Sequence, residues 1–194
     1  MTLANKITVT RGLLIPVFVG FTLYYGQSLE AEEPVAWLRI AAIFTFVVAA
    51  LGDALDGWIA RRFNQQTELG KILDPLVDKA LMLTAIITLS FARWEPQLPL
   101  WFAILVIARD TVNPLGFFLT NHLSPGFKCQ PHWTGKTATA MQMITICWAL
   151  FAIPLSPVWI AAAAGFFTLI SSAIYLIDGV RHLQRSGHAH PNQS

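Results

Sequence analysis

Six long apolar segments constrain this chain more than any other feature. A helix that crosses a bilayer needs about 20 consecutive, mostly apolar residues. Hydrophobic residues make up 55% of the chain and charged residues only 12%, whereas a soluble domain carries about 25% charged residues. The sequence therefore predicts an all-α integral membrane protein with six transmembrane helices, near residues 8–26, 36–60, 70–92, 98–120, 137–155 and 157–179.

The basic residues are unevenly distributed between the ends of these segments. If the N-terminus is cytoplasmic, eleven lysines and arginines fall on the inner side, and only Arg39 and Arg93 fall on the outer side. Because cytoplasmic loops carry the excess of basic residues, this pattern predicts that both termini face the cytoplasm. Residues 1–184 are expected to form one membrane domain, and residues 185–194 a polar cytoplasmic tail.

Composition also excludes two classes of protein. The formal net charge of +2 is too small for a nucleic-acid-binding surface. The two cysteines, Cys129 and Cys147, do not suggest a disulfide framework.

The segment near 8–26 follows basic residues as a signal peptide would, but no small-residue cleavage site follows it.

Four aspartates interrupt the apolar pattern within "LGDALDGWIARRFNQQTELGKILDPLVDK", residues 51–79. Asp53 and Asp56 are three residues apart and Asp74 and Asp78 are four apart, so each pair shares one face of a helix. Small residues on the same faces allow a ligand to approach the backbone; they are Gly57, Ala60 and Gly70. Two antiparallel helices can thus present two carboxylates each to one cavity.

The chemistry of four neighbouring carboxylates indicates a metal site. An aspartate at the centre of a bilayer costs about 2.5–3.5 kcal/mol on insertion scales, and like charges also repel one another. Carboxylate oxygens are hard ligands that suit Mg²⁺ or Mn²⁺, and two such ions about 3.5–4 Å apart form the usual clamp for phosphoryl chemistry. The alternative is that the acids are solvated, or that Asp56 and Asp74 pair with Arg61 or Lys71.

The spacing of these residues resembles a known signature. Residues 53–78 fit D-x2-D-G-x2-A-R-x8-G-x3-D-x3-D at every fixed position, and this is the pattern of the CDP-alcohol phosphotransferase (phosphatidyltransferase) family. The resemblance implies a six-helix membrane enzyme, a homodimer, that takes a CDP-linked lipid donor, usually CDP-diacylglycerol. An acceptor hydroxyl would attack the phosphorus attached to the lipid, and CMP would leave.

The resemblance also implies a role for each residue of the signature. Asp53, Asp56, Asp74 and Asp78 would bind two divalent metal ions, and Asp78 would also act as the base that deprotonates the acceptor. The nucleotide-binding residues implied in this way are Asp53, Asp56, Gly57, Ala60, Arg61 and Gly70.

Three basic residues outside the signature are candidates for binding a phosphorylated acceptor. They are Arg109, Lys136 and Arg181, on three different predicted helices and at the cytoplasmic side. Arg109 lies inside an apolar segment, where a charge needs a reason, and pairing with Asp110 is the alternative explanation.

The choice of acceptor rests on a finer resemblance. "LANKITVTRGLLIPVFV" and "GKTATAMQM" resemble bacterial phosphatidylglycerophosphate synthases, which implies glycerol 3-phosphate as the acceptor. Those enzymes usually continue from the arginine of the fourth helix to a Ser-Gly-Leu-Arg run, whereas this chain has "RDTVNPLGFFL". The same region resembles eukaryote-type cardiolipin synthases, whose acceptor is phosphatidylglycerol.

Two other classes of membrane protein also place aspartates in helices. A membrane prenyltransferase would need two separate aspartate motifs, and the sequence shows one. A divalent-cation transporter would place its acids near the middle of the membrane and would not bind a nucleotide. Metal-dependent binding of CMP would distinguish the transferase from both.

Overall fold

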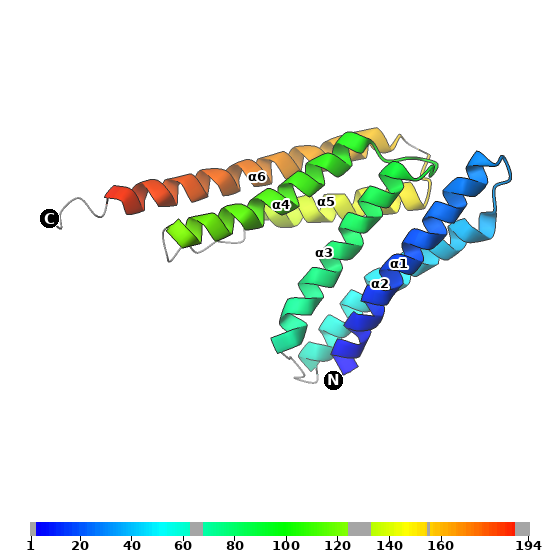
Figure 1. Ribbon diagram of the computed structural model, residues 1–194, viewed down its shortest axis with the longest axis horizontal. Helices are drawn as coiled ribbons and strands as arrows, with labels where there is room; N and C mark the ends of the chain where they lie inside the picture. Colours follow the sequence, from blue (N-terminus) through cyan, green and yellow to red (C-terminus); the bar gives the residue numbers. More distant parts are fainter. Residues whose placement is uncertain (1–2, 63–67, 124–132, 155, 189–194) are drawn as a thin grey trace. The chain divides into compact units, whose positions relative to one another are not determined.

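A computed structural model describes the backbone of residues 3–62, 68–123, 133–154 and 156–188. Side chains are described for residues 6–52, 70, 73–122, 133–154 and 156–184. All regular secondary structure in this described part is helical (Figure 1). The helices are α1 (Leu3–Glu30), α2 (Ala36–Arg62), α3 (Glu68–Phe91), α4 (Leu100–Leu123), α5 (Trp133–Leu150) and α6 (Pro157–His188).

The six expected helices are therefore confirmed, with differences at their ends. The largest difference is in α6, which was expected to end near residue 179 and continues to His188. The apolar pattern stops near residue 179, but the sequence that follows, RHLQR, contains good helix formers. A helix can thus extend beyond the apolar segment that predicts it.

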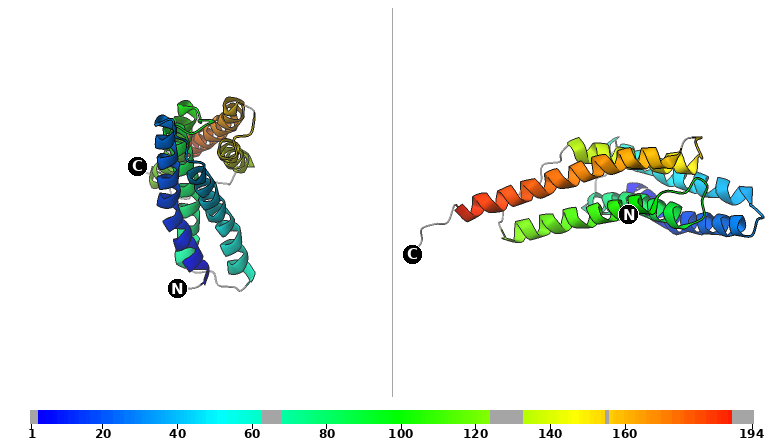
Figure 2. Two further views of the ribbon diagram at one scale, coloured as in Figure 1. Left: turned by 90° about the vertical axis from the view of Figure 1, so that its right-hand side faces the viewer. Right: turned by 90° about the horizontal axis from the view of Figure 1, so that it is seen from above.

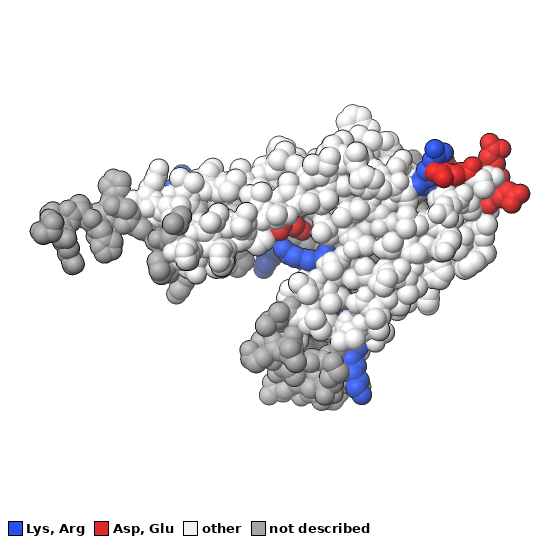
Figure 3. Space-filling model, viewed as in Figure 1, with Lys and Arg blue, Asp and Glu red and all other residues white. Residues whose placement is uncertain are grey.

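The surfaces of the helices are apolar. Large hydrophobic side chains on several helices are 64% to 71% exposed; they include Leu13, Tyr24, Phe44, Phe91, Phe118 and Trp159. On the face drawn in Figure 3, most of the described surface carries no charge, and acidic side chains gather at one end. Apolar exposure on this scale is typical of a protein surrounded by lipid.

Three helices are long and apolar enough to cross a membrane: Lys6–Glu30, Leu100–His122 and Pro157–Gln184, counted over the described residues. Within the described side chains of α2, the apolar stretch is Ala36–Gly52, which is shorter than a span. The acids that were expected to form the metal site interrupt the apolar runs of α2 and α3, while α5 has only 18 residues. The aspartates that suggest a metal site are thus the same residues that lower the hydropathy of α2 and α3.

The chain forms two compact units. Unit 1 comprises Met1–Leu100 and Ile146–Pro157, and unit 2 comprises Trp101–Thr145 and Val158–Ser194.

In unit 1, α1 packs against both α2 and α3. Phe18 of α1 and Phe46 of α2 are fully buried, with ring centroids 5.6 Å apart. At the far end of α1, a methyl group added at Gly26 would lie 3.1 Å from the backbone nitrogen of Arg93, so the glycine permits close approach of the residues that follow α3. The buried indole of Trp94 donates to the carbonyl of Ala149 at 2.9 Å.

In unit 2, α4 and α6 lie side by side in both orientations (Figures 1 and 2). A methyl group added at Gly116 would lie 3.4 Å from the ring of Tyr175, and one added at Gly179 would lie 3.4 Å from the hydroxyl of Thr120. Both pairs are 59 residues apart in sequence, so α4 and α6 run in the same direction. Gln142 of α5 donates to the Thr168 hydroxyl of α6 at 3.1 Å.

Candidate functional site

The aspartates of α3 meet α1. The hydroxyl of Thr8, which is 1% exposed, donates to Oδ1 of Asp74 at 2.8 Å. One turn further along both helices, Nη2 of Arg11 lies 3.8 Å from Oδ1 of Asp78. Because Thr8 pairs with Asp74 and Arg11 with Asp78, the two helices run in the same direction with their polar residues in register.

Arg11 is held on its other side by α2. Its guanidinium is 2% exposed, and Nε donates to the backbone carbonyl of Ala49 at 2.7 Å. A methyl group added at Gly52 would lie 2.9 Å from both Cγ and Cδ of Arg11. The arginine side chain therefore passes over a glycine of α2, where any other residue would collide with it.

The described carboxylates fit a hard divalent cation. Asp74 and Asp78 lie one turn apart on the face of α3 that meets α1, and both offer oxygen ligands. Within the described residues, no three His, Cys, Asp or Glu side chains form a group that could hold a metal. The side chains of Asp53 and Asp56, which would complete a four-carboxylate site, lie outside that part of the structure.

Other members of the predicted nucleotide site also fall outside the described side chains. The backbones of Gly57, Ala60 and Arg61 belong to α2, but their side chains are not described. Gly70 is buried in the first turns of α3. The assignment of these residues to the nucleotide and the metal stays a prediction.

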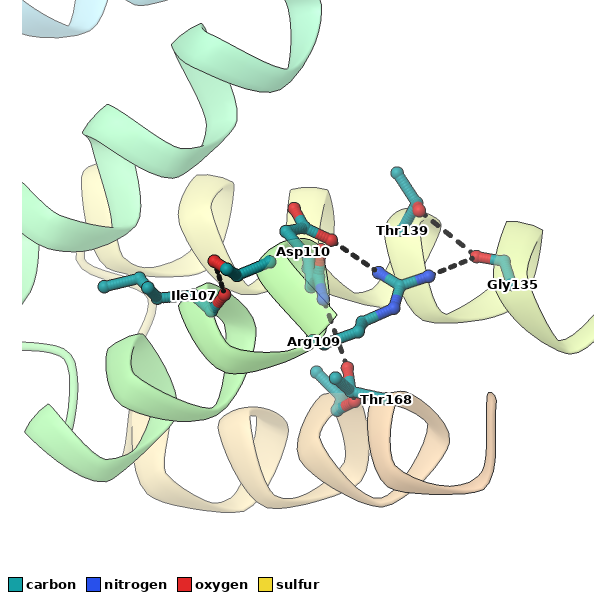
Figure 4. A network of polar contacts seen from close by, with 9 residues as sticks. Ile107, Arg109, Asp110, Gly135, Thr139 and Thr168 are labelled. Atoms are coloured by element: carbon teal, nitrogen blue, oxygen red, sulfur yellow. Dashed lines mark hydrogen bonds and ion pairs between the residues drawn. The ribbon is translucent and has the colours of Figure 1, made fainter. Parts of the chain in front are cut away.

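Arg109 is the centre of a polar network in unit 2 (Figure 4). Its side chain is 11% exposed; Nη1 lies 3.6 Å from a carboxylate oxygen of Asp110, and Nη2 donates to the carbonyl of Gly135 at 3.4 Å. Both distances are long for interactions of a guanidinium. Its Nε is buried and has no hydrogen-bond partner among the described residues. The pairing with Asp110, which was the alternative explanation for Arg109, is thus present at 3.6 Å but leaves Nε without a partner among the described residues.

Gly135 brings α6 into the same network. A methyl group added at Gly135 would lie 3.5 Å from the Ser171 hydroxyl and 3.9 Å from Nη2 of Arg109. The glycine therefore lets Arg109 of α4 and Ser171 of α6 approach the start of α5 closely.

Comparison with known proteins decides the family. The model of the CDP-alcohol phosphatidyltransferase family matches residues 1–172. The chain belongs to this family. It is therefore an enzyme, and the alternative of a cation transporter is not supported.

Three relatives are similar over nearly the whole chain. A Pseudomonas fluorescens protein named CDP-diacylglycerol–glycerol-3-phosphate 3-phosphatidyltransferase is 33% identical, covering 96% of this chain and 94% of its own. The Escherichia coli K12 protein of the same name is 31% identical, covering 91% and 90%. A probable phosphatidylglycerophosphate synthase of Mycobacterium tuberculosis is 32% identical, covering 93% and 83%.

The other two residues predicted to bind the acceptor, Lys136 and Arg181, lie on α5 and α6. Lys136 is exposed and directly follows Gly135, whose carbonyl Arg109 contacts. Arg181 is exposed on α6, ten residues beyond Ser171, which is about 15 Å along a helix. Lys136 thus adjoins a residue of the network in the sequence, whereas Arg181 lies several turns of α6 beyond Ser171.

Sequence reasoning missed four polar residues beside these groups. The sequence showed Thr8 and Arg11 only as letters of the stretch LANKITVTRGLLIPVFV. Arg11 was also one of the eleven basic residues counted on the inner side of the membrane. The spacing of three residues between Thr8 and Arg11 on one helix was the signal that both face one neighbour. The other two, Asn113 and Ser172, each have a buried oxygen without a partner in the described part of the chain. They are separated by 59 residues, like the pairs that face each other across α4 and α6.

Proposed function

We propose that this enzyme transfers the phosphatidyl group of CDP-diacylglycerol to glycerol 3-phosphate and releases CMP. The names of the Pseudomonas and Escherichia relatives support both substrates. In this chain, the observation that carries the acceptor assignment is the incompletely paired guanidinium of Arg109. A buried donor without a partner costs about 1–3 kcal/mol, and more when it is charged. A phosphate would supply the missing acceptors.

The donor is assigned to the signature residues of α2 and α3. We assign Asp53, Asp56, Asp74 and Asp78 as ligands of two divalent ions, Mg²⁺ or Mn²⁺, which would neutralise the phosphate oxygens and activate the phosphorus for displacement. The cytidine diphosphate part is assigned to the remaining signature residues together with the first two aspartates: Asp53, Asp56, Gly57, Ala60, Arg61 and Gly70. Arg61 offers a fork of donors that suits diphosphate oxygens.

The transfer follows from the placement of Asp78. This carboxylate is 36% exposed, which leaves it accessible to an acceptor hydroxyl. It takes the proton of that hydroxyl while the oxygen attacks the phosphorus that carries diacylglycerol. The bond from this phosphorus to the bridging oxygen of the diphosphate breaks, and CMP leaves with the electron pair. The product is phosphatidylglycerophosphate.

The acceptor phosphate is assigned to Arg109 and to Lys136, the residue that follows Gly135, whose carbonyl Arg109 contacts. Arg181 is assigned to the approach path of the acceptor, because it lies further along α6. The hydroxyl groups of the acceptor are assigned to Asn113 and Ser172, whose buried oxygens lack partners among the described residues. A site that binds both a phosphate and hydroxyls fits glycerol 3-phosphate.

The membrane arrangement is proposed on the same basis. Three helices meet the length and hydropathy needed for a span, and we infer that all six cross the bilayer, with both termini in the cytoplasm. The active site would then face the cytoplasm, or the matrix in an organelle. Residues 1–184 would form the membrane domain, residues 185–194 the polar tail, and two copies a homodimer.

One assay tests the reaction and the acceptor together. Full-length enzyme in detergent receives CDP-diacylglycerol, Mg²⁺ and either glycerol 3-phosphate or phosphatidylglycerol, and CMP and lipid products are measured by mass spectrometry. Phosphatidylglycerophosphate from the first mixture is the expected result. Cardiolipin from the second mixture, with no product from the first, would identify a cardiolipin synthase. Release of CMP from neither mixture would contradict the proposed reaction.

A further inference from the structure

We propose that Thr8 and Arg11 of α1 are positioning residues that hold Asp74 and Asp78 ready for divalent metal ions. This inference rests on the proposed role of the two aspartates as metal ligands. Neither α1 residue belongs to the family signature between residues 53 and 78.

Thr8 joins α1 to α3 through its hydroxyl. Thr10 and Thr22 of the same helix donate to the carbonyl four residues earlier, at 2.9 and 2.8 Å. The Thr8 hydroxyl donates to Oδ1 of Asp74 on another helix, α3, at 2.8 Å. The interaction joins residues 66 positions apart, and Thr8 is 1% exposed. Since Oδ1 is fixed in this way, the carboxylate is oriented with its second oxygen available as a ligand.

Arg11 is fixed by contacts with α2 as well as by its ion pair with Asp78. Nε donates to the carbonyl of Ala49 at 2.7 Å, and the chain of methylene groups passes over Gly52. Both contacts come from α2, so the guanidinium cannot move toward solvent without breaking them. The charge near Asp78 is therefore part of the folded structure before any ligand binds. A fixed cation next to clustered carboxylates offsets their mutual repulsion.

The alignment of α1 with α3 places the Thr8–Asp74 and Arg11–Asp78 contacts in successive turns of one interface. Thr8 and Arg11 are three residues apart, Asp74 and Asp78 are four apart, and each spacing is one helical turn. A single packed interface between α1 and α3 thus sets the direction of both carboxylates. Partners that orient metal ligands typically contribute about 10–100-fold to metal affinity or activity.

The test compares two buried threonines of α1 in the full-length enzyme in detergent. Thr8→Val removes the hydroxyl that contacts Asp74, and Thr22→Val removes one that contacts only its own helix in the described structure. Binding of Mn²⁺ to the metal-free protein is measured by electron paramagnetic resonance of free Mn²⁺. Thr8→Val should weaken Mn²⁺ binding about tenfold or more, Thr8→Ser should restore it, and Thr22→Val should leave it within about twofold. Equal Mn²⁺ affinities for Thr8→Val and Thr22→Val would overturn the proposal.

A second pair tests the arginine. Arg11→Gln should weaken Mn²⁺ binding by a similar factor, whereas Arg39→Gln should not. Arg39 is the matched control because its guanidinium stacks 5.1 Å from the Trp94 ring and donates to the Glu95 carbonyl at 3.0 Å, away from any carboxylate named here. Unfolding midpoints of the metal-free variants show how much of any change is structural. If Arg11→Gln cannot be purified folded, the threonine pair decides.

Asp74→Asn separates this inference from the proposed function. If that variant loses Mn²⁺ binding while Thr8→Val retains it, the aspartate is a ligand and the positioning role is wrong. If Asp74→Asn itself binds Mn²⁺ normally, the metal assignment of the proposed function is wrong, and the positioning role falls with it.

Discussion

Two arginines, one in each unit of the chain, are almost equally buried and have very different partners. Arg11 is 2% exposed and donates a short bond of 2.7 Å to Ala49. Arg109 is 11% exposed, its hydrogen bond to Gly135 is 3.4 Å long, and its Nε has no partner in the described structure. Burial alone therefore does not distinguish the arginine that we propose as a positioning residue from the one that we propose binds the acceptor. The partners of the guanidinium do.

The carboxylates beside the two arginines extend this comparison to chemistry. Asp78 lies beside the fixed Arg11 and was predicted to be the base, while Asp110 lies beside Arg109 and has no assigned chemical role. If the difference between the two sites is real, removing these two charges should have unequal consequences.

The largest expected effect is that of Asp78→Asn. A positioned base contributes about 10²–10⁴-fold, so kcat should fall by that factor while binding of CDP-diacylglycerol persists. Asp110→Asn is the matched control and should lower kcat about tenfold or less. Steady-state release of CMP measures both. A loss below tenfold for Asp78→Asn, or an equal loss for the two variants, would remove the distinction.

The next effect concerns substrate affinity. Charge-assisted hydrogen bonds contribute about 1.5–3 kcal/mol each, which is about a 10–100-fold change in binding. Arg109→Gln should raise the KM for glycerol 3-phosphate by that factor and leave the KM for CDP-diacylglycerol nearly unchanged. Arg39→Gln removes a half-buried arginine in the first turn of α2 and should change neither KM. An unchanged KM for glycerol 3-phosphate in Arg109→Gln would mean that the unused donors of Arg109 do not bind the acceptor.

The sequence predicts the surroundings of Arg109 better than those of Arg11. Apolar length was sufficient to predict six helices, and the spacing of the four aspartates was sufficient to identify the family that the comparisons confirm. Arg109 was recognised as a charge in an apolar segment, with Asp110 as its possible partner. That pairing exists, but the long distance that leaves donors unused could not be read from the chain.

Arg11 shows why the rest could not be predicted. Sequence patterns indicate that α1 is helical and apolar, but not which of its faces meets α3 or in which register. The contacts of Thr8 and Arg11 depend on that register, and on a glycine of α2 that lies 41 positions from Arg11 in the sequence. Individual apolar patterns contain no information on such pairings between helices. Arg11, which the sequence indicated only as a basic residue of the inner side, is buried and bonded to α2.

The smallest effect that we predict tests whether Gly52 is what allows Arg11 to be fixed. In Gly52→Ala the new methyl group would meet Cγ and Cδ of Arg11 at 2.9 Å. The arginine is held at Nε and is 2% exposed, so it cannot yield easily. Overpacking of this kind costs about 1–3 kcal/mol, which should exceed the gain of about 1 kcal/mol from replacing a helical glycine by alanine.

Gly20→Ala is the matched control for this change, because a methyl group there would meet nothing within 4 Å. The gain in helix propensity should then act alone. In thermal unfolding of the metal-free enzyme in detergent, Gly20→Ala should have an unchanged or higher midpoint, and Gly52→Ala a lower one. Gly52→Ala should also weaken Mn²⁺ binding, since displacement of Arg11 disturbs Asp78, whereas Gly20→Ala should not. If Gly52→Ala raised the midpoint as much as Gly20→Ala does, Arg11 would have room to move. It would then resemble Arg109, and the contrast between a fixed arginine and a substrate-binding one would no longer hold.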